Sequence, residues 1–178
     1  MPHRIPGERL IAFFSRRGNN YVNGTIVHLS RGNTEIIAEK LQHLTGGELF
    51  RLETVNPYPE DYRKTTEAAR RELQQHIRPE LKGKMPDMEQ FRLIFLGFPN
   101  WWGTMPMAVQ AFMERHDFSG KIIAPFCTHE GSGMGHSEHD IRMLCPGAEV
   151  LPGLAIRGGS VPGADGELTR RLHRLNLC

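Results

Sequence analysis

Continuous apolar runs alternate with amphipathic segments along this chain, and that alternation constrains the fold more than any other feature of the sequence. Three runs are strongly apolar, at residues 10–14, 91–99 and 121–127, and two more polar candidates for strands follow the same rhythm at 48–55 and 148–156. Apolar runs without polar alternation are typical of strands that are covered on both faces of a parallel sheet. Strands that alternate with helices predict an α/β fold with right-handed crossovers and helices on both faces.

The segments between the strands carry apolar residues three or four positions apart, which is the period of an amphipathic helix. Gly46 and Gly47 end the first of these patterns, and Pro106 suits the first turn of the third. We expect helices over 34–44, 61–77, 105–116 and 136–144, and a C-terminal helix marked by Leu168, Leu172 and Leu175.

Five strands favour the order 2-1-3-4-5, which places the two less apolar strands at the edges and the topological switch point between the first and third strands. Ligands of such sheets bind beyond the carboxyl ends of the strands at that point. Pro152 fits an edge strand, but Pro125 conflicts with a central one, because proline cannot donate to the ladder unless a bulge or a strand end falls there.

The composition predicts one soluble domain over residues 10–178, preceded by a flexible arm over residues 1–9. The formal charge is +2 and the basic residues are scattered, which argues against nucleic-acid binding. No apolar run approaches the ~20 residues of a membrane span, and no run near the N-terminus is long enough for a signal peptide, so we expect a cytoplasmic protein. The three cysteines have no CxxC spacing, which indicates reduced thiols.

Three loops should converge beyond the carboxyl ends of the strands. The loop after the first strand contains Ser15 and Arg17 and ends in Gly32, Asn33 and Thr34 directly before a helix. Hydroxyls and free helix amides at one point would suit a dianionic phosphate, although Asn33 or Thr34 could equally serve as a simple helix cap. Arg17 could donate to the phosphate in a bidentate manner or be a solvated surface charge.

The other two loops are suited to a flat ring. Trp101 and Trp102 precede a glycine after the most apolar strand, where they could stack on a ligand or simply pack. The loop 128–135 holds three glycines, so its backbone can approach a planar ligand closely. The cluster of His129, His136 and His139 lacks a clear fourth ligand for a metal, and Cys127 is better explained as a small buried side chain than as a reactive thiol.

These loops, S15-R-R-G-N, G32-N-T34, P99-N-W-W-G-T-M-P and F126-C-T-H-E-G-S-G, resemble the three flavin-binding loops of the flavodoxin family, and they occur in the family's order. The resemblance runs from about Leu10 to the C-terminus. It implies a flavodoxin-like three-layer sandwich with FMN as the cofactor. The cofactor-binding residues that it suggests are Ser15, Arg17, Asn33, Thr34, Pro99, Asn100, Trp101, Trp102, Gly103, Thr128, His129, Glu130, Gly131, Ser132 and Gly133.

Two features depart from the family pattern. Residues 18–31 form an insertion in the phosphate loop, which could fold over the flavin as a lid, with Tyr21 as its key residue, or could be a surface excursion. The chain is also mildly basic, whereas familiar flavodoxins are strongly acidic.

The resemblance leaves three functions open. The first is an FMN-dependent oxidoreductase that takes electrons from NAD(P)H and passes them to a quinone-like or other small acceptor. The second is an electron-transfer flavodoxin with a protein partner, and the third is a nucleotide- or phosphate-binding module without redox activity. A homodimer is compatible with any of them.

Overall fold

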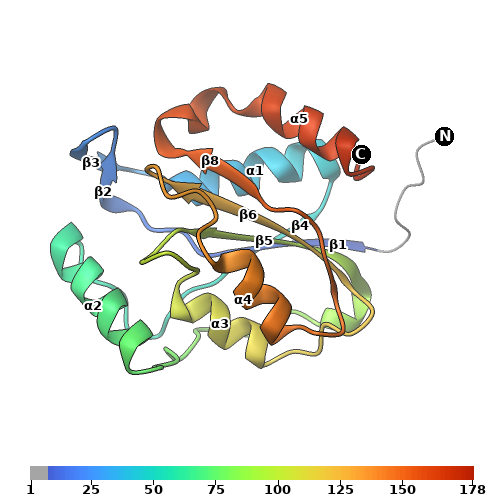
Figure 1. Ribbon diagram of the computed structural model, residues 1–178, viewed down its shortest axis with the longest axis horizontal. Helices are drawn as coiled ribbons and strands as arrows, with labels where there is room; N and C mark the ends of the chain where they lie inside the picture. The colour runs from blue at the N-terminus through green and yellow to red at the C-terminus, as the bar shows by residue number, and fades with distance from the viewer. Residues whose placement is uncertain (1–7) are drawn as a thin grey trace.

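The computed structural model describes residues 8–178, and its strands and helices alternate along the chain as the sequence predicts (Figure 1). The arm predicted over 1–9 lies outside the described residues as far as residue 7, and Glu8 and Arg9 open the first strand. The strands of the main sheet are β1 (Glu8–Phe13), β4 (Glu48–Arg51), β5 (Phe91–Pro99), β6 (Ile122–His129), β7 (Glu149–Val150) and β8 (Leu154–Arg157). The helices are α1 (Asn33–Thr45), α2 (Tyr62–Gln74), α3 (Met107–Glu114), α4 (Ser137–Leu144) and α5 (Asp165–Arg174). Short 3-10 turns, Met88–Gln90 and Gly158–Gly163, precede β5 and α5.

The main sheet is parallel, with the order β4-β1-β5-β6-β7 and with β8 also paired to β6. This arrangement keeps the crossover topology expected from the sequence and corrects the strand count, because six strands replace five. The single strand expected over 148–156 is two short strands, and the break between them contains Pro152. Proline interrupts the ladder there because it has no backbone donor.

The break after β7 also explains how a proline can stand within the central strand β6. Ile123 accepts a 2.9 Å hydrogen bond from the backbone N–H of Leu151, so its peptide faces the last strands. Backbone groups two residues apart face the same side of a strand, and Pro125 therefore faces the same side as Ile123. Pro125 thus lies opposite the gap between β7 and β8, where no donor is needed.

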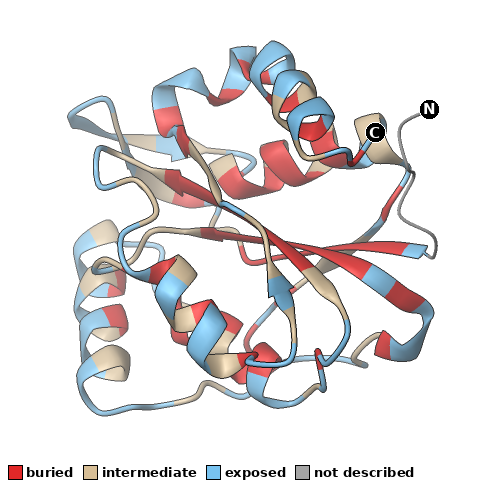
Figure 2. Cartoon of the chain, turned by 45° about the vertical axis from the view of Figure 1, so that its right-hand side comes forward, coloured by how far each residue is buried: buried red, intermediate tan, exposed pale blue. Residues whose placement is uncertain are grey.

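Two hydrophobic cores lie on the two faces of the sheet, because alternate side chains of each strand point to opposite faces. In β1, for example, Leu10 and Ala12 join one core, while Ile11 and Phe13 join the other. Figure 1 shows α1 and α5 over one face and α2, α3 and α4 over the other, and Figure 2 shows the buried residues concentrated along the inner strands. The result is a three-layer α/β sandwich.

The helix α2 ends earlier than its apolar stripe predicts. Its N-terminus is capped, because the Asp61 side chain accepts a 2.8 Å hydrogen bond from the Lys64 N–H. The helix ends at Gln74, and His76 adopts a left-handed φ of 54°. Ile77, which the pattern placed on the buried face, is 39% exposed as a consequence.

The insertion folds as a separate antiparallel hairpin of β2 (Gly18–Val22) and β3 (Thr25–Leu29). Its two-residue turn consists of Asn23 and Gly24, both with positive φ, which is the backbone that tight hairpins require. In Figure 1 the hairpin stands at the carboxyl end of β1, near the start of α2. Over residues 8–178, no helix combines the length and apolarity needed to cross a membrane.

Candidate functional site

The ends of β1, β5 and β6 surround a cavity of about 230 Å³, which we call the loop cavity. Its walls come from all three loops that the sequence singles out, and the hairpin and the start of α2 close it. The lining residues are Ser15, Arg16, Asn20, Tyr21, Asn33, Thr34, Tyr62, Pro99, Asn100, Trp101, Thr128, His129, Glu130 and Ser132. Parallel strands end on the same side of a sheet, which is why loops far apart in sequence meet there.

The start of α1 forms one end of the loop cavity and is built to receive an anion. Gly32 is the N-cap residue and contributes no side-chain hydrogen bond, and the Ser15 hydroxyl accepts a 3.0 Å hydrogen bond from the Glu35 N–H. The first amides of a helix have no intrahelical acceptor, so those of Asn33 and Thr34 remain available to a ligand. The sequence left open whether Asn33 or Thr34 caps the helix or helps to bind a phosphate. In the structure, neither side chain forms the cap.

This end of the loop cavity is tightly packed. The hydroxyls of Thr34 and Thr128 lie 2.8 Å apart, which ties the loop after β1 to the loop after β6. A Cβ atom on Gly32 would lie 2.2 Å from the Ser15 hydroxyl and 2.6 Å from the Arg16 carbonyl oxygen. The close approach of these backbones explains why glycine occupies this position.

Asn100 organises the loop after β5. Its amide nitrogen donates to the Gly133 carbonyl at 2.8 Å, and its amide oxygen accepts from the Gly103 N–H at 3.0 Å. The same side chain thus fixes its own loop and the glycine-rich loop after β6. Rigid positioning of both loops is what a planar ligand held between them would require.

The two tryptophans have different environments. Trp101 lines the loop cavity and packs edge-to-face against Phe14 and Tyr58, with ring centroids 5.2 and 5.1 Å apart. Trp102 is 53% exposed and turns to α2, where its indole N–H donates to the Thr66 carbonyl at 2.9 Å and Arg70 lies over its ring. Only one indole of the pair can therefore contact a ligand in the loop cavity.

The loop after β6 presents His129 in a defined tautomer. The Gly131 N–H donates to its Nδ1 atom at 2.9 Å, so a neutral imidazole carries its proton on Nε2. Burial lowers the pKa of His129, and the nearby Arg157 lowers it further. The loop cavity is thus lined by a neutral imidazole whose free ring nitrogen is a donor.

The hairpin contributes Asn20 and Tyr21 to the lining of the loop cavity. Tyr21 from β2 stacks on Tyr62 at the start of α2, with ring centroids 6.1 Å apart, and both rings line the cavity. The N–H of Asn23 at the hairpin tip donates to a Glu130 carboxylate oxygen at 3.0 Å. The sequence pointed to Tyr21 but not to Tyr62. Tyr62 fits the apolar stripe of α2, so packing against the core was enough to explain its ring.

Four predicted residues lie outside the lining of the loop cavity, in addition to Trp102. Arg17 forms two hydrogen bonds to Glu35, at 3.1 and 3.3 Å, and faces a neighbouring cavity. Gly103, Gly131 and Gly133 support the lining through the contacts given above. Arg16, which was not among the predicted binding residues, does line the loop cavity, although its guanidinium donates to the carbonyls of Asn19, Pro59 and Glu60.

The thiols and histidines nearby have no reactive arrangement. Burial raises the pKa of the Cys127 thiol to about 12, so this side chain is a protonated, inert group. All three cysteines are free thiols. Within residues 8–178, no group of three His, Cys, Asp or Glu side chains is placed to hold a metal ion.

Comparison with known proteins gives a consistent family. The family model described as Flavodoxin matches residues 25–165. A Bacteroides uniformis protein assigned as a flavoprotein is 23% identical, with a TM-score of 0.72 and coverage of 92% of this chain and 98% of that chain. A flavoprotein from Lactobacillus acidophilus, crystallised with FMN, is 20% identical, with a TM-score of 0.63 and coverage of 90% and 99%.

A more distant structure, an NADH:FMN oxidoreductase in its apo form, is 9% identical, with a TM-score of 0.56 and coverage of 96% and 89%. These structures share the fold of this chain. No curated protein matches the sequence significantly.

Proposed function

The chain belongs to the flavodoxin family, and from that premise we propose that its loop cavity binds FMN and that the protein is an FMN-dependent oxidoreductase. The observation that carries the proposal is the convergence of three loops, from β1, β5 and β6, on one cavity that two hairpin residues also line. A nicotinamide nucleotide is the electron donor and a quinone-like or other small molecule the acceptor in this proposal. The structure of a similar flavoprotein with FMN supports the choice of cofactor.

The chemical types of the side chains that line the loop cavity suit FMN. The end of the loop cavity at the start of α1, which we call the phosphate seat, offers hydroxyl and N–H donors that suit the phosphate of FMN. These donors are Ser15, Thr34 and the first amides of α1. Trp101 and the stacked tyrosines Tyr21 and Tyr62 offer aromatic surface, which suits the ring. FMN would supply hydride and single-electron chemistry when bound, and no side chain is required as an acid or base.

The chain's own residues then orient the ring and limit its contact with water. Asn100 fixes the two loops beside the ring relative to each other. The neutral His129 contributes an N–H donor without a formal charge. The hairpin, held to Glu130, adds Asn20 and Tyr21 to the residues that would surround the ring.

An enzyme is favoured over an electron carrier for two reasons. A carrier that docks on protein partners relies on charge complementarity, and the formal net charge of +2 lacks the strong acidic excess of familiar flavodoxins. The hairpin also contributes Asn20 and Tyr21 to the lining of the loop cavity, which would restrict the approach of a large partner more than that of a small molecule.

Purification and titration test the cofactor. We expect a yellow protein, or an apoprotein that quenches the fluorescence of added FMN with one site per chain. A colourless protein that leaves FMN fluorescence unchanged would instead indicate a phosphate-binding module and would refute the flavin proposal.

Anaerobic reduction tests the activity of the FMN-loaded protein. We expect NADH or NADPH to bleach the visible flavin absorbance, and a quinone to restore it over many turnovers. A flavin that dithionite reduces but neither nicotinamide nucleotide reduces would identify an electron carrier.

A further inference from the structure

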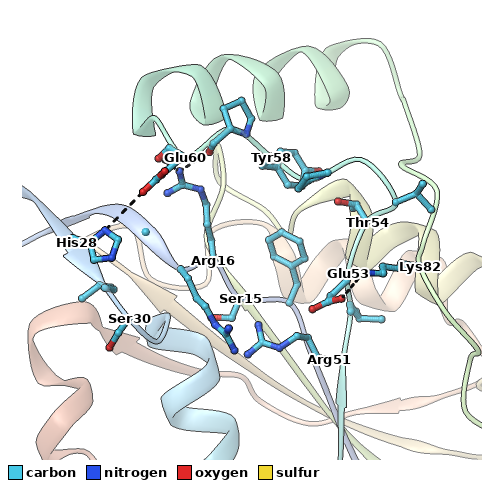
Figure 3. A pocket seen from close by; sticks show the side chains of 18 residues that line it. Ser15, Arg16, His28, Ser30, Arg51, Glu53, Thr54, Tyr58, Glu60 and Lys82 are labelled. Carbon is cyan, nitrogen blue, oxygen red and sulfur yellow. Dashed lines mark hydrogen bonds and ion pairs between the residues drawn. The ribbon is translucent and has the colours of Figure 1, made fainter.

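A second cavity, of about 640 Å³, lies on the other side of the loop after β1 from the proposed flavin site. The ends of β1 and β4, the strand β3, the segment 54–60 and Lys82 line it, and we call it the arginine cavity (Figure 3). Its volume is within the range of small-molecule sites, roughly 300–1,000 Å³. It shares only Ser15 and Arg16 with the lining of the loop cavity.

Arg16 forms the wall between the two cavities. Its guanidinium donates to the carbonyl oxygens of Asn19, Pro59 and Glu60, and Figure 3 shows the side chain reaching across to Glu60. These bonds join the hairpin, the segment before α2 and the end of β1. The wall is therefore fixed, and a ligand in one cavity does not fill the other.

One side of the arginine cavity has an excess positive charge. Arg17 and Arg51 both bind the carboxylate of Glu35. Arg17 donates to its two oxygens at 3.1 and 3.3 Å, and Arg51 contacts the oxygen that Arg17 binds at 3.1 Å. Burial raises the pKa of Glu35, but the hydrogen bonds from the two arginines outweigh burial, so its pKa lies below the usual value. Two guanidinium ions thus share the Glu35 carboxylate, which can balance only one of their two charges; Glu53 and Glu39 also interact electrostatically with Arg17, but both lie beside other cations, Lys82 and Arg31.

The other charged groups of the arginine cavity are nearly balanced. Lys82 lies 3.9 Å from Glu53, and the Arg16 guanidinium interacts electrostatically with Glu60. Figure 3 shows these pairs on opposite sides, with Arg51 near neither Glu60 nor Tyr58. An anion would therefore gain the largest electrostatic stabilisation beside Arg17 and Arg51.

The opposite wall is apolar and aromatic. Phe14 and Tyr58 meet edge-to-face with ring centroids 5.8 Å apart, and the lining also includes Leu52, Val55 and Pro57. The Tyr58 hydroxyl donates to Glu72 at 2.6 Å, outside the cavity lining, so its ring presents carbon to the cavity. A ligand with an apolar, flat body would bury that body against this wall.

We propose that the arginine cavity binds a small aromatic carboxylate, with its carboxylate on Arg17 and Arg51 and its ring on the wall of Phe14 and Tyr58. A carboxylate carries one negative charge, which matches the single uncompensated positive charge of the arginine pair. Each guanidinium has five N–H donors, so both arginines keep donors that Glu35 does not engage and that a carboxylate can accept. This site is independent of the flavin and does not rest on the proposed redox function.

The proposal is tested with 2-naphthoate as the probe, added to the full-length protein with FMN present. We expect saturable binding, seen as shifts of the methyl NMR signals of Leu52 and Val55, with Ile156 in the other core as a reference that stays unchanged. 2-Naphthamide tests the charge and acetate tests the apolar wall, and both should bind at least tenfold more weakly. Equal binding of 2-naphthamide, or displacement of 2-naphthoate by an equal concentration of inorganic phosphate, would overturn the assignment.

The variant Arg17→Gln removes the uncompensated charge and leaves the pair of Arg51 and Glu35 intact. Because the Arg17 side chain is 61% exposed, the variant should fold normally, and it should bind 2-naphthoate about tenfold more weakly. The variant Arg142→Gln, an exposed arginine on α4, is the matched control and should keep wild-type affinity. An unchanged affinity in Arg17→Gln would refute the site, and this result does not depend on whether FMN binds.

Discussion

The hydroxyl of Thr34, at the start of α1, lies 2.8 Å from the hydroxyl of Thr128, at the end of β6. The two residues are 94 positions apart in sequence, and both side chains are buried. This contact joins the proposed phosphate seat to the proposed ring loop, so each half of the site depends on the position of the other.

Replacing Thr34 by valine tests this contact. The change keeps the shape of the side chain but leaves the Thr128 hydroxyl buried without its partner, which costs about 1–3 kcal/mol. We expect a lower free energy of unfolding by that amount and FMN affinity reduced about tenfold, measured by urea denaturation and by fluorescence titration. Thr169→Val on the exposed face of α5 is the control, and an FMN affinity within twofold of wild type in Thr34→Val would contradict the prediction.

Gly32→Ala tests the tight phosphate seat. The added Cβ would overlap the Ser15 hydroxyl and the Arg16 carbonyl oxygen, and a backbone atom cannot move away as a flexible side chain can. Overpacking of this kind typically costs about 1–3 kcal/mol, and the displaced loop should also lose most of its FMN affinity. Gly163→Ala, where the Cβ meets nothing within 4 Å, should leave both the melting temperature and the FMN affinity unchanged. If both variants behave alike, the seat is not crowded in solution.

Tyr21→Ala tests the covering role of the hairpin. The substitution removes the ring that stacks on Tyr62 and opens one side of the loop cavity, while the hairpin's own backbone pairing remains. We expect faster dissociation of FMN, by roughly threefold to tenfold if the stack is worth about 1 kcal/mol, and stronger quenching of flavin fluorescence by iodide. Thr25→Ala, at an exposed position on β3, is the control, because Thr25 is one residue from the position paired with Tyr21 and so faces the other side of the hairpin. An iodide accessibility equal to that of wild type would show that the hairpin is a surface excursion.

The pH dependence of stability tests the state of His129. Burial and Arg157 lower its folded-state pKa below the unfolded value of 6.5, so the unfolded chain takes up a proton more readily. The free energy of unfolding should therefore be highest above pH 6.5 and should fall as the pH decreases through the interval below it. His129→Gln should reduce this loss.

His116, whose pKa burial and Arg115 also lower, gives a similar but separate contribution, so His116→Gln is the comparison. The ¹⁵N shifts of His129 should show the proton on Nε2. A protonated Nδ1 at neutral pH would contradict the assigned tautomer.

Much of the fold could be predicted from the sequence because the signals are local. The apolar run 91–99 becomes β5 with the same bounds, and the less apolar strand at 48–55 becomes the edge strand β4, although it is shorter. Burial on one or two faces determines which residues a strand can contain, and this requirement is visible in any short window of sequence. The start of α1 beside the loop after β1 is predictable for the same reason.

Two structural details could not be predicted from the sequence. The sequence showed the conflict at Pro125 but could not resolve it, because the answer is the break around Pro152 in a different strand. Likewise, α2 ends before Ile77 because the chain turns at His76, which the apolar period does not record.

The sequence by itself determined which loops meet: parallel strands in this order must bring the segments after β1, β5 and β6 to one edge. Only the tertiary structure decided where individual side chains go. Arg17 turns to Glu35 and the arginine cavity, Trp102 turns to the Thr66 carbonyl, and the hairpin lies against Glu130. Each of these long side chains or loops has several possible partners, and the distant atom that satisfies its charge or its N–H becomes its neighbour only when the chain has folded.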